Sequence, residues 1–105
     1  MHKHPKTLLV IFAEAALEKL LVQDAKRLGV HGYTIWDVRG ASGLDGNQAN
    51  LREGAWEADR TIEMKLICSE DVANRMAEHV IGQYAPHYGL TLYFADVQVL
   101  RDGKF

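Results

Sequence analysis

The sequence predicts an α+β domain of the ferredoxin-like type, in which a four-stranded antiparallel sheet carries two helices on one face. Four stretches show the β-branched or alternating apolar patterns of strands, and two longer stretches show the periodicity of amphipathic helices. Their order is β-α-β-β-α-β, which is the order of that fold. The length of 105 residues suits one domain, which we expect to span residues 1–105.

The first half of the chain is predicted to form two strands and a helix. Residues 7–12 (TLLVIF) are continuously apolar, which is typical of a strand buried on both faces. Residues 14–29 predict a helix, with Glu14 at its positive start and Gly29 as its stop. Its expected apolar stripe comprises Leu17, Leu20, Leu21 and Leu28. Residues 33–38 (YTIWDV) are rich in strand-forming types and predict the second strand.

The second half repeats the pattern in the order strand, helix, strand. Residues 60–68 alternate between polar and apolar types and predict the third strand. Ser69 is a typical N-cap for a helix over residues 70–84. That helix places apolar residues four apart, with further apolar residues beside them: Val72, Met76, Val80 and Tyr84, then Ala73, Ala77 and Ile81. Residues 91–100 (TLYFADVQVL) predict the fourth strand.

A polar, glycine-rich loop over residues 40–57 joins the second and third strands. A hairpin needs only about two to five residues, and long loops in compact domains are usually functional or disordered. Gly40 and Gly43 leave backbone amides open to an anion. Basic residues lie on the loop, near its base or at the C-terminal end: Arg39, Arg52, Arg60, Lys65, Arg101 and Lys104. Together they indicate an anion or nucleotide site at a subunit interface, and the alternative is a mobile surface loop.

The uncovered face of the sheet predicts self-association. Two helices cover one face, yet residues 7–12 are apolar on both sides. The fourth strand is also apolar on both sides: Leu92, Phe94 and Leu100 point one way, and Tyr93, Ala95, Val97 and Val99 the other. A monomer would expose a large apolar patch, which is uncommon, so we expect a closed homo-oligomer.

Composition and motifs argue against several classes of protein. The net charge of −2 is too close to neutral for a general nucleic-acid binder. No apolar run approaches the roughly 20 residues of a membrane span, and we find no signal peptide. The single Cys68 suits a reducing compartment, so we expect a cytoplasmic protein. No sequence motif of a hydrolase, a P-loop or a zinc protease occurs, and we expect no catalytic residues.

The histidines are weak candidates for chemistry. His2 and His4 form an H-x-H pair that could hold a metal, but a frayed N-terminus is the commoner explanation. His87 and Tyr88 lie at a turn where either could touch a ligand. His79 lies on the second helix, between the apolar stripe and solvent. We therefore assign no metal site.

Over its whole length the chain resembles the PII-type signalling proteins. Residues 29–43 (GVHGYTIWDVRGASG) are similar to the second strand of that family and the base of its long T-loop. Residues 70–84, after an alternating third strand, and residues 97–104 (VQVLRDGK) also fit. The resemblance implies a homotrimer that binds adenine nucleotides in the clefts between subunits. It also implies that the T-loop, here residues 40–57, engages a target protein.

The resemblance further implies which residues meet the nucleotide. Thr34 matches a threonine that would contact adenine. Gly40, Ser42 and Gly43 match the base of the T-loop and would meet the phosphates.

Four other positions complete the implied site. Arg101 matches the arginine that ends the fourth strand and would reach phosphate from a neighbouring subunit. Arg60 and Lys65 lie near a lysine of the third strand, so one or both would line the site. Gly89 lies in residues 85–91 (APHYGLT), where other members carry a glycine- and lysine-rich phosphate-binding loop.

The chain departs from the family pattern at several places, and these departures limit which nucleotide and which kind of control are expected. Without that phosphate-binding loop, ADP or AMP is expected rather than a triphosphate. Residues 40–57 contain no tyrosine, so control by uridylylation is not expected. The second strand is most like the carbon-metabolism branch, including carboxysome-associated members. That likeness implies a role in inorganic carbon metabolism, with bicarbonate as a candidate second ligand and a transporter or carboxysome-associated protein as a candidate target.

Two other functions remain open from the sequence. A trimeric CutA-like or other ferredoxin-like protein, acting in metal response or small-molecule catalysis, would share the strand order and the oligomer. Such a protein would not need the long loop and would be expected to cluster His, Cys or carboxylate side chains, which are sparse here. A purely structural interaction module is the third interpretation.

Overall fold

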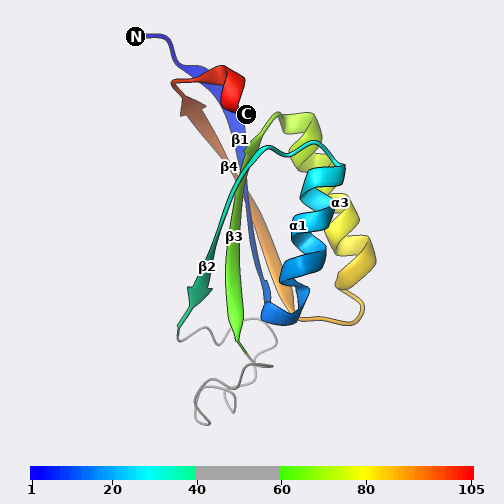
Figure 1. Ribbon diagram of the computed structural model, residues 1–105. Coiled ribbons are helices and arrows are strands. Elements are labelled where there is room, and N and C mark those ends of the chain that lie inside the picture. Colours follow the sequence, from blue (N-terminus) through cyan, green and yellow to red (C-terminus); the bar gives the residue numbers. More distant parts are fainter. Residues whose placement is uncertain (40–59) are drawn as a thin grey trace.

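The computed structural model of the chain describes residues 1–39 and 60–105 (Figure 1). Its elements, in chain order, are β1 (His4–Glu14), the short turn η1 (Ala15–Leu17), α1 (Glu18–Arg27), β2 (Gly32–Val38), β3 (Thr61–Cys68), α3 (Glu70–Tyr84), β4 (Leu90–Val99) and the turn η3 (Asp102–Lys104). The predicted β-α-β-β-α-β order is confirmed. The T-loop predicted at residues 40–57 lies outside the described residues.

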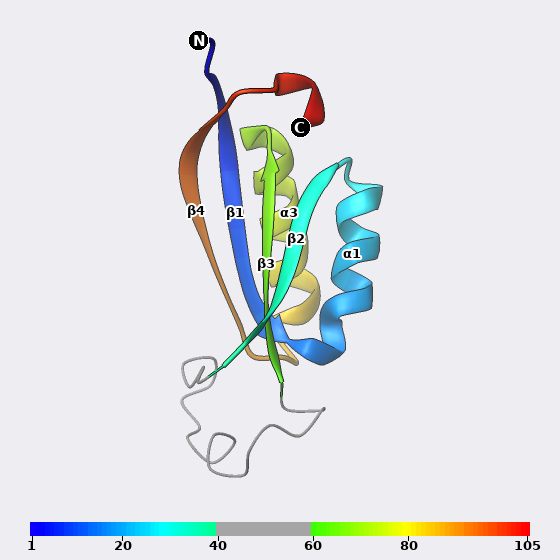
Figure 2. The ribbon, with the colours of Figure 1, turned by 60° about the vertical axis from the view of Figure 1, so that its left-hand side comes forward.

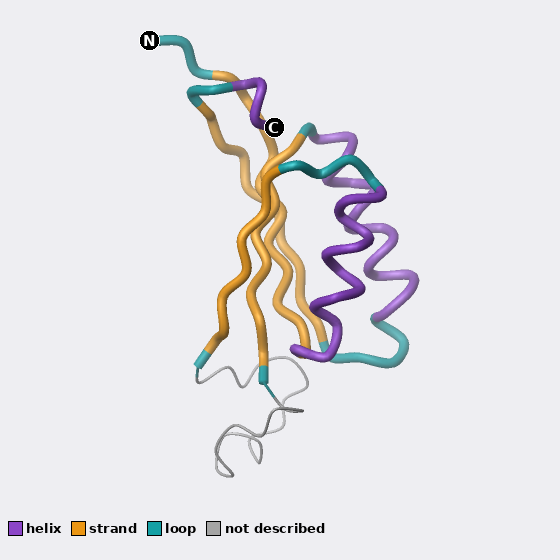
Figure 3. Tube along the Cα trace, in the orientation of Figure 1, coloured by secondary structure: helices purple, strands orange, loops and turns teal. Residues whose placement is uncertain are grey.

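The described strands form a four-stranded sheet in the order β2-β3-β1-β4, and every neighbouring pair is antiparallel. Both helices pack on the same face, so the other face carries no helix (Figures 1 and 3). We call the latter the helix-free face. The loop end of the sheet is the end where β1 and β2 finish and β3 and β4 begin. The terminal end is the opposite end, where both termini lie (Figure 1). These facts confirm the predicted ferredoxin-like fold.

The core lies between the sheet and the two helices. On β1, Leu9, Ile11 and Ala13 are fully buried against the helices, as strand alternation predicts. Val10 points to the helix-free face and is also fully buried, so the predicted two-sided burial holds at the centre of the strand. The helices contribute buried side chains at a spacing of four: Leu17, Leu21 and Ala25 around α1, and Met76, Val80 and Tyr84 on α3. Cys68 is buried in the same core.

Several predicted helix boundaries are confirmed. The hydroxyl of Ser69 accepts the Val72 N–H at 3.2 Å, as an N-cap does. Gly29 has φ of +90°, a conformation that suits glycine after the end of a helix. Within residues 1–39 and 60–105, no helix is long and apolar enough to cross a membrane.

Two predicted core residues and one predicted helix start are wrong. Leu20 and Ile81 are expected in apolar stripes, but 43% and 49% of their surfaces are exposed. Each helix rests on the sheet along a line of positions four apart, and these two side chains lie beside that line. Glu14 is the last residue of β1, where it pairs with Thr61, and not the start of a helix. The turn η1 separates it from α1.

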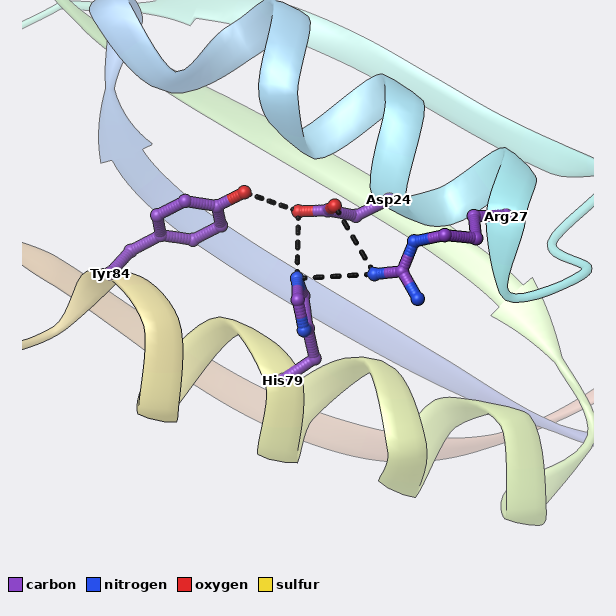
Figure 4. A network of polar contacts seen from close by, with 4 residues as sticks. All are labelled: Asp24, Arg27, His79 and Tyr84. Atoms are coloured by element: carbon purple, nitrogen blue, oxygen red, sulfur yellow. Dashed lines mark hydrogen bonds and ion pairs between the residues drawn. The ribbon is translucent and has the colours of Figure 1, made fainter.

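A polar network joins the two helices near their contact (Figure 4). The Tyr84 hydroxyl on α3 donates to Oδ2 of Asp24 on α1 at 2.5 Å. His79 Nε2 lies 3.1 Å from the same oxygen, and Arg27 Nη2 lies 3.4 Å from Oδ1. Arg27 Nη2 also lies 3.3 Å from His79 Nε2, but a ring nitrogen that donates to a carboxylate cannot accept from a guanidinium. The Asp24 carboxylate is therefore the common acceptor of the network.

This network changes the acidity of Tyr84. Burial, followed by the hydrogen bond to Asp24 and the charge of that carboxylate, raises the pKa of Tyr84 from 10.0 to about 12. The folded state therefore favours the neutral phenol. The resulting stabilisation is fully present below pH 10.0 and is lost as the pH rises toward about 12.

Removal of the Tyr84 hydroxyl should destabilise the packing between the helices. In Tyr84→Phe, Asp24 loses a hydrogen bond, and such a bond to a charged group contributes about 1.5–3 kcal/mol. We expect the free energy of unfolding in urea at pH 7 to fall by about 1.5 kcal/mol or more. The loss of stability between pH 10.0 and about 12 should also be smaller than in the wild type.

Tyr88→Phe is the matched control, because 38% of Tyr88 is exposed. This variant should unfold at the same urea concentration as the wild type. Equal stability of Tyr84→Phe and Tyr88→Phe would show that the hydrogen bond to Asp24 contributes nothing.

Candidate functional site

The first pair of predicted site residues lies on the helix-free face, about midway along the edge strand β2 and its neighbour β3. Thr34 on β2 lies directly opposite Lys65 on β3. Directly opposite residues of an antiparallel pair have Cβ atoms about 4.5–5.5 Å apart, so both side chains can touch one ligand. Thr34 is exposed and Lys65 is half-buried. This pair offers a hydroxyl and an ammonium group to a polar or anionic ligand.

Trp36 lies next to this pair and has a direct contact with it. The Lys65 ammonium lies 5.1 Å from the centre of the Trp36 ring, within the range of a cation–π interaction. The ring is nevertheless 47% exposed. Because side chains two apart on a strand share a face, Thr34 and Trp36 point the same way.

The same face is apolar toward β1 and β4. Tyr93, across β1 from Lys65 through Val10, is 47% exposed. Its ring lies 6.4 Å from that of the half-buried Phe12. The face therefore combines aromatic surface that can hold a flat ring with polar groups that can hold a charge.

The C-terminal segment crosses the terminal end of the sheet (Figure 2). Lys6 on β1 forms an ion pair of 2.9 Å with Asp102, and this contact lowers the pKa of the Asp102 carboxyl. The Phe105 ring lies over Gly32, the first residue of β2, so that a Cβ atom there would meet a ring carbon at 2.7 Å. Residues 101–105 thus lie across the sheet from β4 to β2.

The loop end of the sheet carries a second group of polar residues. Arg60 Nη1 lies 3.7 Å from Asp37 Oδ2, and the Arg60 carbonyl accepts the Ala15 N–H at 2.8 Å. The Gly89 N–H, just before β4, donates to Oε2 of Glu14 at 2.7 Å. The amide of Gly89, one of the predicted nucleotide-site residues, therefore already binds a carboxylate.

The predicted site residues fall into separate places in one chain. Thr34 and Lys65 are adjacent, whereas Arg60 and Gly89 lie at the loop end. Arg101 follows β4 at the terminal end, and the ten residues of β4 span about 33 Å. Gly40, Ser42 and Gly43 lie outside the described residues. One chain cannot bring Arg101 to Gly89, so a site that contains both needs a second subunit.

Two features of this surface were not predicted as functional. Trp36 could have been found, because its spacing from Thr34 places it on the same face of a strand. The Glu14–Gly89 contact joins residues 75 apart and has no local sequence signal. His87 and Tyr88 are exposed in the turn after α3, while His79 belongs to the helix network. Among the described residues, no group of three or more His, Cys, Asp or Glu side chains could hold a metal.

Sequence and structure comparisons place the chain among known proteins. The family described as nitrogen regulatory protein P-II matches residues 6–104. A PII-like signalling protein from Thermus thermophilus is 37% identical, with a TM-score of 0.83, and the match covers 100% of this chain and 99% of that one. Among curated protein sequences, none matches this chain.

More distant structures share the fold. CPII from Thiomonas intermedia K12, bound to ADP, AMP and acetate, is 24% identical with a TM-score of 0.81, covering 100% of this chain and 98% of that one. CPII bound to ADP, AMP and bicarbonate is 23% identical with a TM-score of 0.74, covering 99% of this chain and 100% of that one. At this identity the likeness concerns the fold.

Substitution of Gly32 should displace the C-terminal segment. In Gly32→Ala the new methyl group would lie 2.7 Å from the Phe105 ring, so the ring must move away. We expect trypsin to cleave after Arg101 several-fold faster than in the wild type, as followed by mass spectrometry. Gly82→Ala on α3 is the control, because no atom lies within 4 Å of the place that its methyl group would take. Equal cleavage of both variants would refute the role of the Phe105–Gly32 contact.

Proposed function

Because this chain belongs to the nitrogen regulatory protein P-II family, we propose that it is a regulatory protein that binds ADP or AMP between the subunits of a homotrimer. The observation that carries the proposal is the Thr34–Lys65 pair beside exposed aromatic rings on the helix-free face. A nucleotide needs apolar surface for its base and cationic groups for its phosphates, and this face offers both.

The trimer is supported by the same exposed surface. Trp36 and Tyr93 each leave 47% of their surface uncovered in a single chain. Residues of this size dominate interface energetics when they are buried. Burial against identical chains in a closed ring removes the patch from water without an open edge.

The two ends of the sheet support a site shared between chains. In one subunit, Thr34 contacts the base and Lys65 contacts the inner phosphate. Arg101, at the terminal end, reaches the phosphates from the neighbouring subunit, and its guanidinium suits an oxyanion. Gly40, Ser42 and Gly43 remain proposed phosphate contacts on the family pattern.

The signalling role is proposed to be in inorganic carbon metabolism. CPII, which shares the fold, has been seen with ADP, AMP and bicarbonate, and this supports bicarbonate as a second ligand here. If bicarbonate and nucleotide interact favourably when bound, each must raise the affinity of the other by the same factor. Residues 40–57 would then report the bound state to a target protein, such as a transporter or a carboxysome-associated protein.

Calorimetric titration separates this proposal from its rivals. ADP, AMP, ATP and divalent metal ions are titrated into the purified protein. Nucleotide binding supports the P-II function. Metal binding without nucleotide binding supports the CutA-like alternative. If neither nucleotide nor metal binds, the result supports a structural interaction module.

The assembly itself can be measured by light scattering. At micromolar concentration the mass should be about three times the 11.8 kDa of one chain. Tyr93→Glu should give monomers, because it places a charge on the proposed interface. Ile81→Glu is the matched control, since Ile81 is similarly exposed at 49% but lies on a helix, on the other side of the sheet. A wild-type monomer would contradict the shared site.

Replacement of Arg101 tests the contact from the second subunit. Arg101→Ala should weaken ADP binding by about 1.5–3 kcal/mol, the usual contribution of a hydrogen bond to a charged group. The fold of each chain should persist, because Arg101 is exposed in the single chain. The control is Arg75→Ala, which removes the same charge from the outer side of α3, where Arg75 pairs with Asp71. Unchanged ADP affinity in an intact Arg101→Ala trimer would remove Arg101 from the site.

A further inference from the structure

We propose that Glu14 limits the number of phosphates that the nucleotide site accepts. The inference rests on the proposed nucleotide function and names a residue that sets its specificity. It starts from the hydrogen bond of 2.7 Å between Oε2 of Glu14 and the N–H of Gly89. This contact places a carboxylate on the backbone amide of Gly89, a predicted nucleotide-site residue in the turn before β4.

The position of Glu14 is fixed by the sheet. It is the last residue of β1, and its neighbour Ala13 pairs with Leu90, the residue after Gly89. On its other side Glu14 pairs with Thr61, the residue after Arg60. The carboxylate is partly buried between these neighbours rather than free in solvent.

The other predicted site residues, Arg60 and Gly89, lie beside Glu14 at the loop end, so a phosphate tail that reaches them from Lys65 runs toward this carboxylate. A base held at Thr34 and a phosphate held at Lys65 lie about midway along β2 and β3. From Lys65 to Thr61 the strand runs four residues, or about 13 Å, to the loop end. Each phosphate added in the direction of Arg60 therefore moves negative charge closer to Glu14.

The Glu14 carboxylate then distinguishes nucleotides with few phosphates from those with more. The Gly89 N–H can donate to a phosphate oxygen only after the Glu14 carboxylate has left it. A terminal phosphate that approaches without replacing the carboxylate meets a like charge in a partly buried place, where screening by water is weak. AMP and ADP place less charge at this end, so the site should favour them over ATP.

Substitution of Glu14 with glutamine tests the effect of its negative charge separately from that of its hydrogen bond. The side-chain amide oxygen can still accept the Gly89 N–H, so the turn stays anchored while the negative charge is removed. We expect the ratio of ATP affinity to ADP affinity to rise about tenfold, which corresponds to about 1.4 kcal/mol. The ratio is measured by calorimetry on the intact assembly, in chelator and without divalent metal, so that no cation masks the phosphates.

Glu70→Gln is the matched control. It makes the same change of charge at the start of α3, while Gly89 follows the end of that helix, whose 15 residues span about 22 Å. This variant should keep the wild-type ratio. Should Glu14→Gln fail to assemble, Glu14→Ala serves the same test, because it also removes the charge.

The outcomes separate this inference from the proposed function. If the wild type binds no nucleotide, the proposed function fails and the inference falls with it. If the wild type binds ADP and the ATP-to-ADP ratio is the same in the assembled Glu14 variant, the inference alone is overturned. In that case the Glu14–Gly89 contact only anchors the turn.

Discussion

The pairing of β1 along both of its edges is the constraint on which the rest of the structure depends. Because β3 and β4 both pair with it, this strand sets the register of the central sheet and the face on which each side chain lies. Both helices cover one face, so every alternate residue of the four strands is left on the other. The position of Tyr93 and the Glu14–Gly89 contact follow from that register, and the pairing of β2 with β3 then places Thr34 opposite Lys65.

Most of the fold could be predicted because it is encoded locally. Alternation in residues 60–68 and the apolar run in residues 7–12 give the strands, and Ser69 and Gly29 mark helix ends through their own backbone chemistry. The residues whose burial was predicted wrongly lie where burial depends on contacts between distant segments. Leu20 and Ile81 have the right composition for a core, but the line of contact between helix and sheet passes beside them.

The candidate site was less predictable than the fold. Sequence spacing places Thr34 on a strand, but only the register shows that Lys65, rather than Arg60, lies opposite it. The position of Arg101 beyond the far end of β4 is equally a matter of topology, and a site that included both Arg101 and Gly89 would need two chains. The contact of Glu14 could not be predicted, because a carboxylate near an expected helix start has an ordinary local explanation.

The cation–π contact between Lys65 and Trp36 has a spectroscopic consequence. An indole ring reports changes in nearby charge through its fluorescence, and this ring has an ammonium group 5.1 Å from its centre. An anion that draws the ammonium aside would change the emission. The sequence has only one other tryptophan, Trp56, so its replacement with phenylalanine would leave a single indole as an intrinsic optical reporter on this face.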